Sequence, residues 1–292
     1  MNSSKSVDVV IPCYNGAKFI ERCIKSVLAQ TSPINKIIFV DDGSTDNSLS
    51  IILKLQEESA SIQVITQDNQ GLAAARNKGV SFSDAAFISF LDVDDYWLPR
   101  KIENQINLVE SDTSDHRVAI ASNYFDESGS NRRRGITNHN HRLISPESLL
   151  TYRCVVPGSG SSALIPRLIL DQVGLFNEEL RYGEDLDLWI RIAQDFQWLI
   201  SAERDVVIYS NPDGIQARKM DAINAFERDS LKILERYRKY LSNITYFVMK
   251  SYIYSISIRS LSGQRSFALR DFLHLTVGLF YSLSIKIDRK YL

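Results

Sequence analysis

The sequence is poor in cysteine and contains no long apolar run. Its three cysteines, Cys13, Cys23 and Cys154, are widely spaced and form no CxxC pair. This pattern argues against a disulfide framework and against a zinc site, so we expect buried thiols in a reducing cytosol. No stretch reaches about 18 uninterrupted apolar residues, which predicts that no helix spans a membrane. Residues 1–16 are interrupted too early by Pro12 to form a signal peptide.

The chain also has almost no net charge, because 34 Lys and Arg stand against 35 Asp and Glu. The balance gives the whole molecule no electrostatic attraction to nucleic acid or to membrane. The charge is distributed unevenly, however. Residues 232–292 contain 11 Lys and Arg against 3 Asp and Glu, a net charge of +8, which leaves −9 for residues 1–231. The last part of the chain is therefore basic and the rest acidic.

Two common nucleotide-binding motifs are missing. No GxxxxGK[ST] segment is present, which disfavours a P-loop enzyme of nucleotidyl or phosphoryl transfer. The first turn reads PCYNGA and not GxGxxG, which disfavours a dinucleotide-dependent oxidoreductase. The nucleotidyl or phosphoryl transferase remains a less favoured alternative.

The first hundred residues repeat one pattern. A short apolar run is followed by a turn with polar residues or glycine, and then by a segment with helical spacing. The predicted strands cover residues 7–11, 36–40, 63–66 and 86–91. Four successive strand-helix units predict an α/β fold with a doubly wound, mainly parallel sheet.

After about residue 215 this pattern gives way to long helical spacing. We therefore expect a domain over residues 1–215 and a basic, aromatic-rich helical extension over residues 216–292. The extension has two interpretations. It packs on the first domain, or residues 232–292 lie on an anionic membrane through their aromatic and basic side chains.

Polar residues follow three of the predicted strands directly. Ligands of open α/β sheets bind outside the carboxyl ends of the strands, so these residues are expected at one binding edge. They are Tyr14 and Asn15 after the first strand, Asp41 and Asp42 after the second, and Asp92, Asp94 and Asp95 after the fourth. Five carboxylates at one edge repel one another unless a cation joins them, and hard oxygen ligands suit Mg²⁺ or Mn²⁺.

A divalent ion with one or two protein carboxylates usually takes its other ligands from phosphate oxygens and water. The edge is therefore expected to bind a nucleoside diphosphate rather than to form a closed metal cage. Arg76, on the helix opened by Gly71, is a candidate for a further contact to base or phosphate.

Five motifs follow one another along the chain: VVIPCYNG (9–16), VDDGSTDNS (40–48), QGLAAARNKG (70–79), FLDVDD (90–95) and GEDLDLWIR (183–191). In this order they resemble a family 2 glycosyltransferase with the A-type fold over roughly residues 5–200. The resemblance implies a nucleotide-binding half and an acceptor half. It also implies transfer of a sugar from a nucleotide-sugar with inversion at the anomeric carbon.

The resemblance assigns roles to residues of the first half. Pro12 and Tyr14 match residues that line the nucleotide pocket, and Asn15 is assigned to the same pocket. Asp42 matches the carboxylate that reads the base, and Arg76 matches a nucleotide contact.

The remaining roles concern the metal and the chemistry. Asp92 matches a contact to ribose or metal, and Asp94 matches the metal-binding acid of the DxD motif. Asp185 matches the catalytic base. The implied cofactor is Mn²⁺ or Mg²⁺, which neutralises the charge on the leaving diphosphate. The base is needed because an acceptor hydroxyl is a poor nucleophile at neutral pH.

The expected donor is a UDP-sugar, and the expected acceptor is a glycan or a lipid-linked acceptor in cell-surface polysaccharide synthesis. No QxxRW motif follows, which favours transfer of one sugar over processive synthesis. The expected location is cytoplasmic, or peripheral on the inner face of the plasma membrane. A non-catalytic nucleotide-sugar or glycan-binding module is the remaining alternative, and an intact Asp185 argues against it.

Several polar residues also have structural interpretations. Asp46 is expected to cap a helix, and Asp95 either caps a helix or supports a metal ligand. Glu184 either orients Asp185 or is exposed. Asp187 and Arg191 are expected to form a structural pair four residues apart.

Three segments in the middle of the chain have less specific interpretations. NHNHR (138–142) and RRRG (132–135) are interpreted as solvated segments, and VPGSGSSALIP (156–166) as a flexible loop entering a strand.

Overall fold

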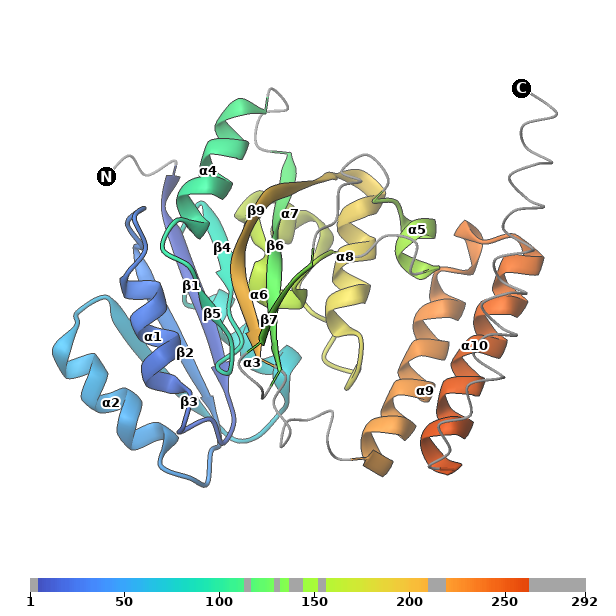
Figure 1. Cartoon of the computed structure of the whole chain (residues 1–292), viewed down its shortest axis with the longest axis horizontal. Helices are drawn as coiled ribbons and strands as arrows, with labels where there is room; N and C mark the ends of the chain where they lie inside the picture. Colours follow the sequence, from blue (N-terminus) through green and yellow to red (C-terminus); the bar gives the residue numbers. More distant parts are fainter. Residues whose placement is uncertain are drawn as a thin grey trace. The chain divides into compact units, whose positions relative to one another are not determined.

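The computed structural model describes residues 5–112, 117–128, 132–136, 144–151, 156–209 and 219–262 (Figure 1). The chain divides into two compact units, residues 1–214 and 215–292. Each unit is described by itself below.

The first unit begins with the alternation of strands and helices that the apolar pattern predicts. Its elements are β1 Val7–Cys13, α1 Ile20–Leu28, β2 Lys36–Asp42, α2 Ser48–Glu58, β3 Ile62–Gln67, α3 Leu72–Ser81 and β4 Phe87–Phe90. The four strands are parallel and lie in the order β3-β2-β1-β4. The predicted α/β fold is thus confirmed, and each strand is found within a few residues of its predicted place.

The second half of this unit extends the same sheet. Its elements are β5 Tyr96–Trp97, α4 Lys101–Ser111, β6 Val118–Ser128, β7 Arg132–Ile136, α5 Pro146–Leu150, α6 Ser159–Ser162, β8 Leu164–Pro166, α7 Arg167–Val173, α8 Glu184–Asp195 and β9 Gln197–Tyr209. The described strands continue in the order β4-β8-β6-β9-β5, with β7 beside β6.

The extended sheet is mixed, since β8 is antiparallel to both β4 and β6, whereas β6 and β9 are parallel. The direction of β8 has a local cause. It leaves the short helix α6, which lies at the carboxyl end of β4, and it therefore runs back along β4.

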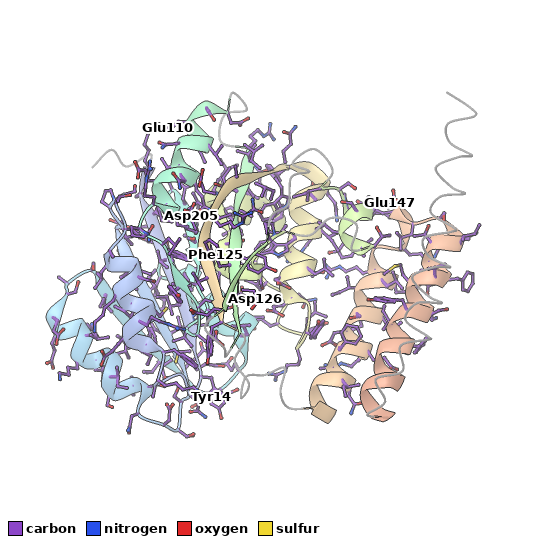
Figure 2. The ribbon with its side chains drawn as sticks, viewed as in Figure 1. Tyr14, Glu110, Phe125, Asp126, Glu147 and Asp205 are labelled. Atoms are coloured by element: carbon purple, nitrogen blue, oxygen red, sulfur yellow. The ribbon has the colours of Figure 1, made fainter. Side chains whose placement is uncertain are left out.

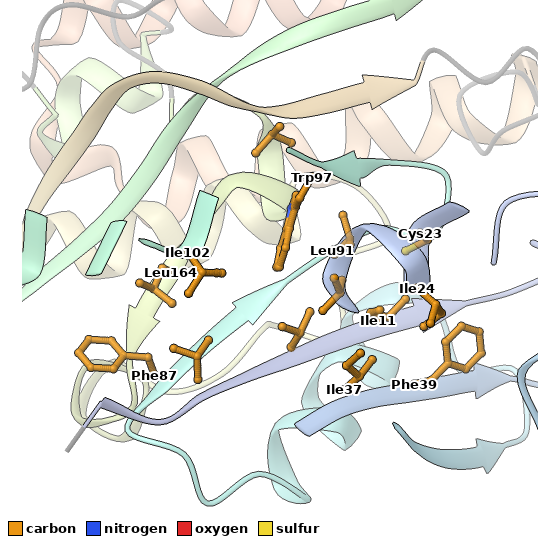
Figure 3. Close-up of a cluster of buried hydrophobic side chains, with 14 of the residues drawn as sticks. Ile11, Cys23, Ile24, Ile37, Phe39, Phe87, Leu91, Trp97, Ile102 and Leu164 are labelled. Atoms are coloured by element: carbon orange, nitrogen blue, oxygen red, sulfur yellow. The ribbon is translucent and has the colours of Figure 1, made fainter. Parts of the chain in front are cut away.

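Helices cover both faces of the parallel half. All seven residues of β1 are buried, as expected for a central strand with two covered faces. Val7, Val9 and Ile11 belong to a cluster that also contains apolar residues of α1 and α4 (Figure 3). On the other face, a Cβ on Gly79 of α3 would lie 2.3 Å from Val10 Cγ1, so glycine permits this close approach of α3 to β1.

A row of aromatic rings anchors α8 to the sheet. The ring of Phe90 lies 5.1 Å from that of Phe176, and the ring of Trp189 lies 6.5 Å from Phe176 and 4.9 Å from Trp198. Such edge-to-face pairs add to the free energy gained by burying the rings. The row fixes the start of α8, which carries the predicted base, relative to the end of β4.

Cys13 and Cys23 are buried free thiols, as expected, and Cys154 lies outside the described residues. Burial raises the pKa of Cys13 to about 11, so this thiol stays protonated at neutral pH.

The second unit contains two long helices, α9 Lys219–Arg236 and α10 Asn243–Ser262, joined through a 3₁₀ turn at Arg238–Tyr240. The helices pack through buried apolar residues that include Ile233, Leu234, Met249 and Ile253. Within the described ranges, no helix combines the length and the apolar character needed to cross a membrane.

Candidate active site

The carboxyl ends of β1, β2 and β4 meet at one edge of the sheet. Cys13 pairs with Asp41, and Val10 pairs with Phe90, so continuing the register places Asp92 near Pro12. Tyr14 follows β1 at the lower edge of the sheet in Figure 2, and 42% of its surface is exposed. The strand ends therefore meet at one edge as predicted, with an exposed aromatic ring beside it, and the binding role of this edge stays a prediction.

Asn15 ties the end of β1 to the turn after β2. It adopts φ 54°, a left-handed conformation that Asn tolerates better than most residues. Its Oδ1 accepts hydrogen bonds from Thr45 N at 2.7 Å and from Asp46 N at 3.3 Å. Asp46 in turn accepts from Ser48 N at 2.9 Å, at the start of α2, consistent with its predicted capping role. Asn15 thus shapes the wall of the edge.

The two carboxylates that end β2 have different surroundings. Asp42 Oδ1 accepts from Gln67 Nε2 and Gln70 N, and its Oδ2 accepts from Gly71 N, all at 2.8 Å. Both oxygens of Asp42 thus hold the segment that leads into α3. Asp41 is also buried, yet its Oδ1 accepts no hydrogen bond from any described residue. A buried acceptor without a partner costs free energy, and the contact of Asp42 to the base stays a prediction.

The loop after β4 carries the DxD motif and is held from several directions. Asp92 N donates to Ser161 Oγ at 3.0 Å, and Arg22 Nη2 donates to the Asp94 carbonyl at 2.5 Å. The buried Asp95 accepts from Ser161 Oγ at 2.6 Å and from Tyr209 N at 2.9 Å. Burial, together with the charges of Asp92 and Asp94, raises the pKa of Asp95 well above its usual range. Asp95 therefore braces the loop and does not cap α4.

The acidic residues of this loop fit a divalent metal only in part. Within the part of the chain that the structure describes, no group of three or more His, Cys, Asp or Glu side chains could hold a metal ion. A closed cage among these residues is thus not supported. Asp92 and Asp94 nevertheless supply hard oxygen donors on one loop, and both are only half-buried. They fit an ion that completes its coordination with diphosphate oxygens and water.

Arg76 connects this loop to α8. Its guanidinium is fully buried, and it donates to Asp92 Oδ1 at 2.7 Å and to Glu184 Oε1 at 2.9 Å. The cation also lies over the ring of Phe176, 5.1 Å from the centroid. Burial opposes the charge, but the carboxylates of Asp92 and Glu184 more than offset it and raise the pKa of Arg76. Two protein carboxylates thus bind the guanidinium, and Arg76 is buried. Its contact to the nucleotide stays a prediction.

The acidic pair at the start of α8 follows Gly183, which adopts φ 72°. Glu184 is nearly buried, and burial together with the charge of Asp185 raises its pKa to about 7, although Arg76 opposes the shift. Asp185 is half-buried, and its Oδ2 accepts from Ser159 Oγ at 2.7 Å. Glu184 thus points to Arg76, while Asp185 keeps access to solvent.

Asp187 and Arg191 form the expected structural pair, with Arg191 Nε 2.9 Å from Asp187 Oδ2. Arg191 also donates to the carbonyls of Val173, the last residue of α7, and of Leu175.

The segment VPGSGSSALIP enters a strand, β8, as predicted, but the part before the strand is not a flexible loop. Its described residues form the short helix α6 and strand β8, and they are hydrogen-bonded to both acidic motifs. Its alternation of glycine and serine resembled a flexible loop, because nothing local reveals partners that lie far along the chain. The NHNHR segment and the side chains of Arg132, Arg133 and Arg134 lie outside the described residues.

Comparisons with known proteins agree with this geometry. The family model described as Glycosyl transferase family 2 matches residues 8–174. A protein of Rickettsia felis called an uncharacterized glycosyltransferase is 33% identical over 198 residues, which cover 64% of this chain and 31% of that protein. A similar protein of Rickettsia typhi is 30% identical over 201 residues, which cover 65% of this chain and 59% of that protein. The chain thus matches less than two thirds of the length of either relative.

Solved structures show the same fold. S. aureus TarS 1-349 in complex with UDP-GlcNAc aligns with a TM-score of 0.63 and 17% sequence identity, over 90% of this chain and 75% of that chain. The complex of the same protein with UDP gives a TM-score of 0.60 and 20% identity, over 90% of this chain and 73% of that chain.

Proposed function

The chain belongs to glycosyltransferase family 2, and from this premise we propose that residues 1–215 form a catalytic domain that transfers one sugar from a nucleotide-sugar to an acceptor hydroxyl with inversion. One observation carries the proposal. Arg76 joins Asp92, at the proposed diphosphate side, to Glu184, next to the proposed base. One buried side chain thus connects the group at the leaving diphosphate to the group next to the base, and a single displacement needs both ends.

The nucleotide is proposed to bind at the edge formed by β1 and β2. Pro12 lies at the end of β1, and the exposed ring of Tyr14 offers a surface for a base. Asp42 is the proposed carboxylate that reads the base, and its three hydrogen bonds hold it in place. UDP is the proposed nucleotide, since the aligned TarS structures contain UDP or UDP-GlcNAc.

Mn²⁺ or Mg²⁺ is the proposed cofactor, with Asp94 as the main ligand and Asp92 as a further contact to ribose or metal. When bound, the ion would neutralise the charge that develops on the leaving diphosphate. Asp95, Ser161 and Arg22 hold the loop in place before the ligand arrives.

Asp185 is the proposed base. It is half-buried, its carboxylate lies at the start of α8, and Ser159 holds one of its oxygens. It would take the proton of the acceptor hydroxyl as the new bond forms. Asp185→Asn keeps nearly the same shape but cannot accept this proton. We expect kcat to fall about 10²- to 10⁴-fold while the donor affinity stays near that of the wild type.

The acceptor is proposed to be a glycan or a lipid-linked acceptor of cell-surface polysaccharide synthesis, on the cytoplasmic side of the membrane. Residues 232–292 are proposed to contact anionic lipid, because they are basic and α10 exposes Ile244, Phe247 and Tyr254.

A thermal-shift panel with UDP, GDP and dTDP, each with and without Mn²⁺, tests the donor site without knowledge of the acceptor. A ligand that binds only the folded state raises the melting temperature, and at a given concentration the rise is larger the lower the Kd. We expect UDP, alone among the three diphosphates, to stabilise the protein in the presence of Mn²⁺. Without an acceptor, the enzyme should slowly transfer the sugar of the matching nucleotide-sugars to water and release UDP. No stabilisation by any of the three, or stabilisation without release from any sugar tested, would contradict the proposed enzyme.

A further inference from the structure

Three consecutive residues of α6, Ser159, Gly160 and Ser161, each contact a different part of the proposed site. These contacts reach the proposed base, the bridging arginine and the DxD loop. The contacts of Ser159 and Ser161 were described above one by one, and together they give the segment a role as a unit.

Ser159 has an unusual backbone and holds Asp185. Its φ is 49°, and Gly158 before it has φ 71°, so two residues in succession are left-handed. For a residue with a Cβ this conformation is strained, and it persists only where the surroundings impose it. The conformation brings Ser159 Oγ to 2.7 Å from Asp185 Oδ2, while Asp185 Oδ1 accepts from Leu186 N at 2.7 Å. Both oxygens of the proposed base are therefore oriented.

Gly160 lies against the buried guanidinium of Arg76. A Cβ at position 160 would be 2.9 Å from Arg76 Nη2 and 3.2 Å from Cζ. Although arginine side chains are usually flexible, this one is held by Asp92 and Glu184 and has no free direction in which to move. Glycine is therefore required at this contact.

Ser161 is buried and holds the loop after β4. Its hydroxyl donates to Asp95 Oδ2 at 2.6 Å and accepts from Asp92 N at 3.0 Å. Its carbonyl accepts from Trp97 Nε1 at 2.8 Å. This one residue thus contacts the loop on both sides of Asp94.

We propose that Ser159, Gly160 and Ser161 form a positioning unit that sets the separation between Asp185 and the DxD loop. The proposal rests on the proposed function. Because consecutive Cα atoms are 3.8 Å apart across a trans peptide, the short segment leaves little freedom between its two ends. Small displacements of reacting groups, on the order of 1 Å, are costly in rate, so such a rigid spacer favours transfer.

The two serines are expected to give opposite kinetic signatures. Ser159→Ala should lower kcat for nucleotide-sugar turnover about 10-fold or more, with the Kd for UDP in Mn²⁺ within about 2-fold of the wild type. Ser161→Ala should weaken UDP binding in Mn²⁺ about 10-fold, because the loop loses both hydrogen bonds. Calorimetry with UDP and MnCl₂ measures Kd, and release of UDP from the donor selected above measures kcat.

Two further variants separate positioning from folding. Ser159→Gly also removes the hydroxyl but relieves the backbone strain, so a loss of kcat equal to that of Ser159→Ala assigns the effect to the hydroxyl. Ser162→Ala is the matched control, since its hydroxyl donates to the carbonyls of Pro157 and Ser159 and contacts neither acidic motif. It should lower the melting temperature and leave kcat and Kd within about 2-fold of the wild type.

Wild-type kcat in Ser159→Ala would overturn the proposal, as would a parallel loss of kcat and affinity in Ser159→Ala, Ser161→Ala and Ser162→Ala. Asp185→Asn, measured beside them, distinguishes the two levels. If it is inactive while Ser159→Ala is fully active, only the positioning unit fails. If Asp185→Asn itself is active, the proposed base fails.

Discussion

Replacing Arg76 by methionine removes the cation that Asp92 and Glu184 share, while it keeps an unbranched side chain in the same space. Arg76 has a side chain that is 1% exposed, compared with 12% for Glu184 and 25% for Asp92. Removal of one partner from a buried ion pair typically costs about 3 to 5 kcal/mol of stability. Here the partly exposed Asp92 can be solvated and Glu184 can bind a proton. We therefore expect a loss of stability at the lower end of this range, about 3 kcal/mol at pH 8.

The cost should depend on pH, and the sign follows from Glu184. Burial already raises the pKa of Glu184 to about 7, above its unfolded value. Stability from such a group is present at low pH and is lost as the pH rises through the folded pKa. Loss of Arg76 raises that pKa further, so the penalty in Arg76→Met should be smaller at pH 6 than at pH 8. The change is limited to about 1.4 kcal/mol per pH unit.

Urea unfolding of the wild type, Arg76→Met, Glu184→Gln and the double variant, at pH 6 and pH 8, measures these free energies. The double variant should be more stable than the sum of the single changes implies, because it leaves no unpaired charge at position 184. A penalty below about 1 kcal/mol that is equal at both pH values, with additive single effects, would refute the reasoning.

Three further outcomes are expected. Asp94→Asn should keep the fold but lose the Mn²⁺-dependent stabilisation by UDP, and wild-type UDP binding that is indifferent to EDTA would contradict the metal assignment. If residues 232–292 bind membrane, the protein should sediment with anionic but not neutral vesicles, and salt should weaken the binding; equal recovery with both would contradict it. Lys101 is fully buried, and burial lowers its pKa well below the usual range. A lysine that gives up its proton on folding contributes less stability as the pH falls. The free energy of unfolding in urea of the wild type, relative to that of Lys101→Met, should therefore increase from pH 7 to pH 9. A difference that is independent of pH would contradict this.

Local patterns in the sequence were sufficient for the first half of the fold. The alternation of apolar runs and helical spacing depends on residues that are neighbours along the chain, and it predicted β1 to β4 within a few residues. The pair Asp187 and Arg191 was predictable for the same reason, since one helical turn brings them together. The mixed second half was not, because the direction of β8 depends on where α6 leaves the edge of β4.

Sequence alone determined that acidic residues would gather where the strands end, because parallel strands place their carboxyl ends at one edge of a sheet. Only the tertiary structure decided which of these oxygens already have partners within the protein. The partners of Asp42 lie 25 to 29 positions away, and the partner of Arg76 on α8 lies 108 positions away. Contacts over such distances are set by packing and leave no periodic signal, so the unpartnered oxygen of Asp41 and the burial of Arg76 became visible only when the chain was folded.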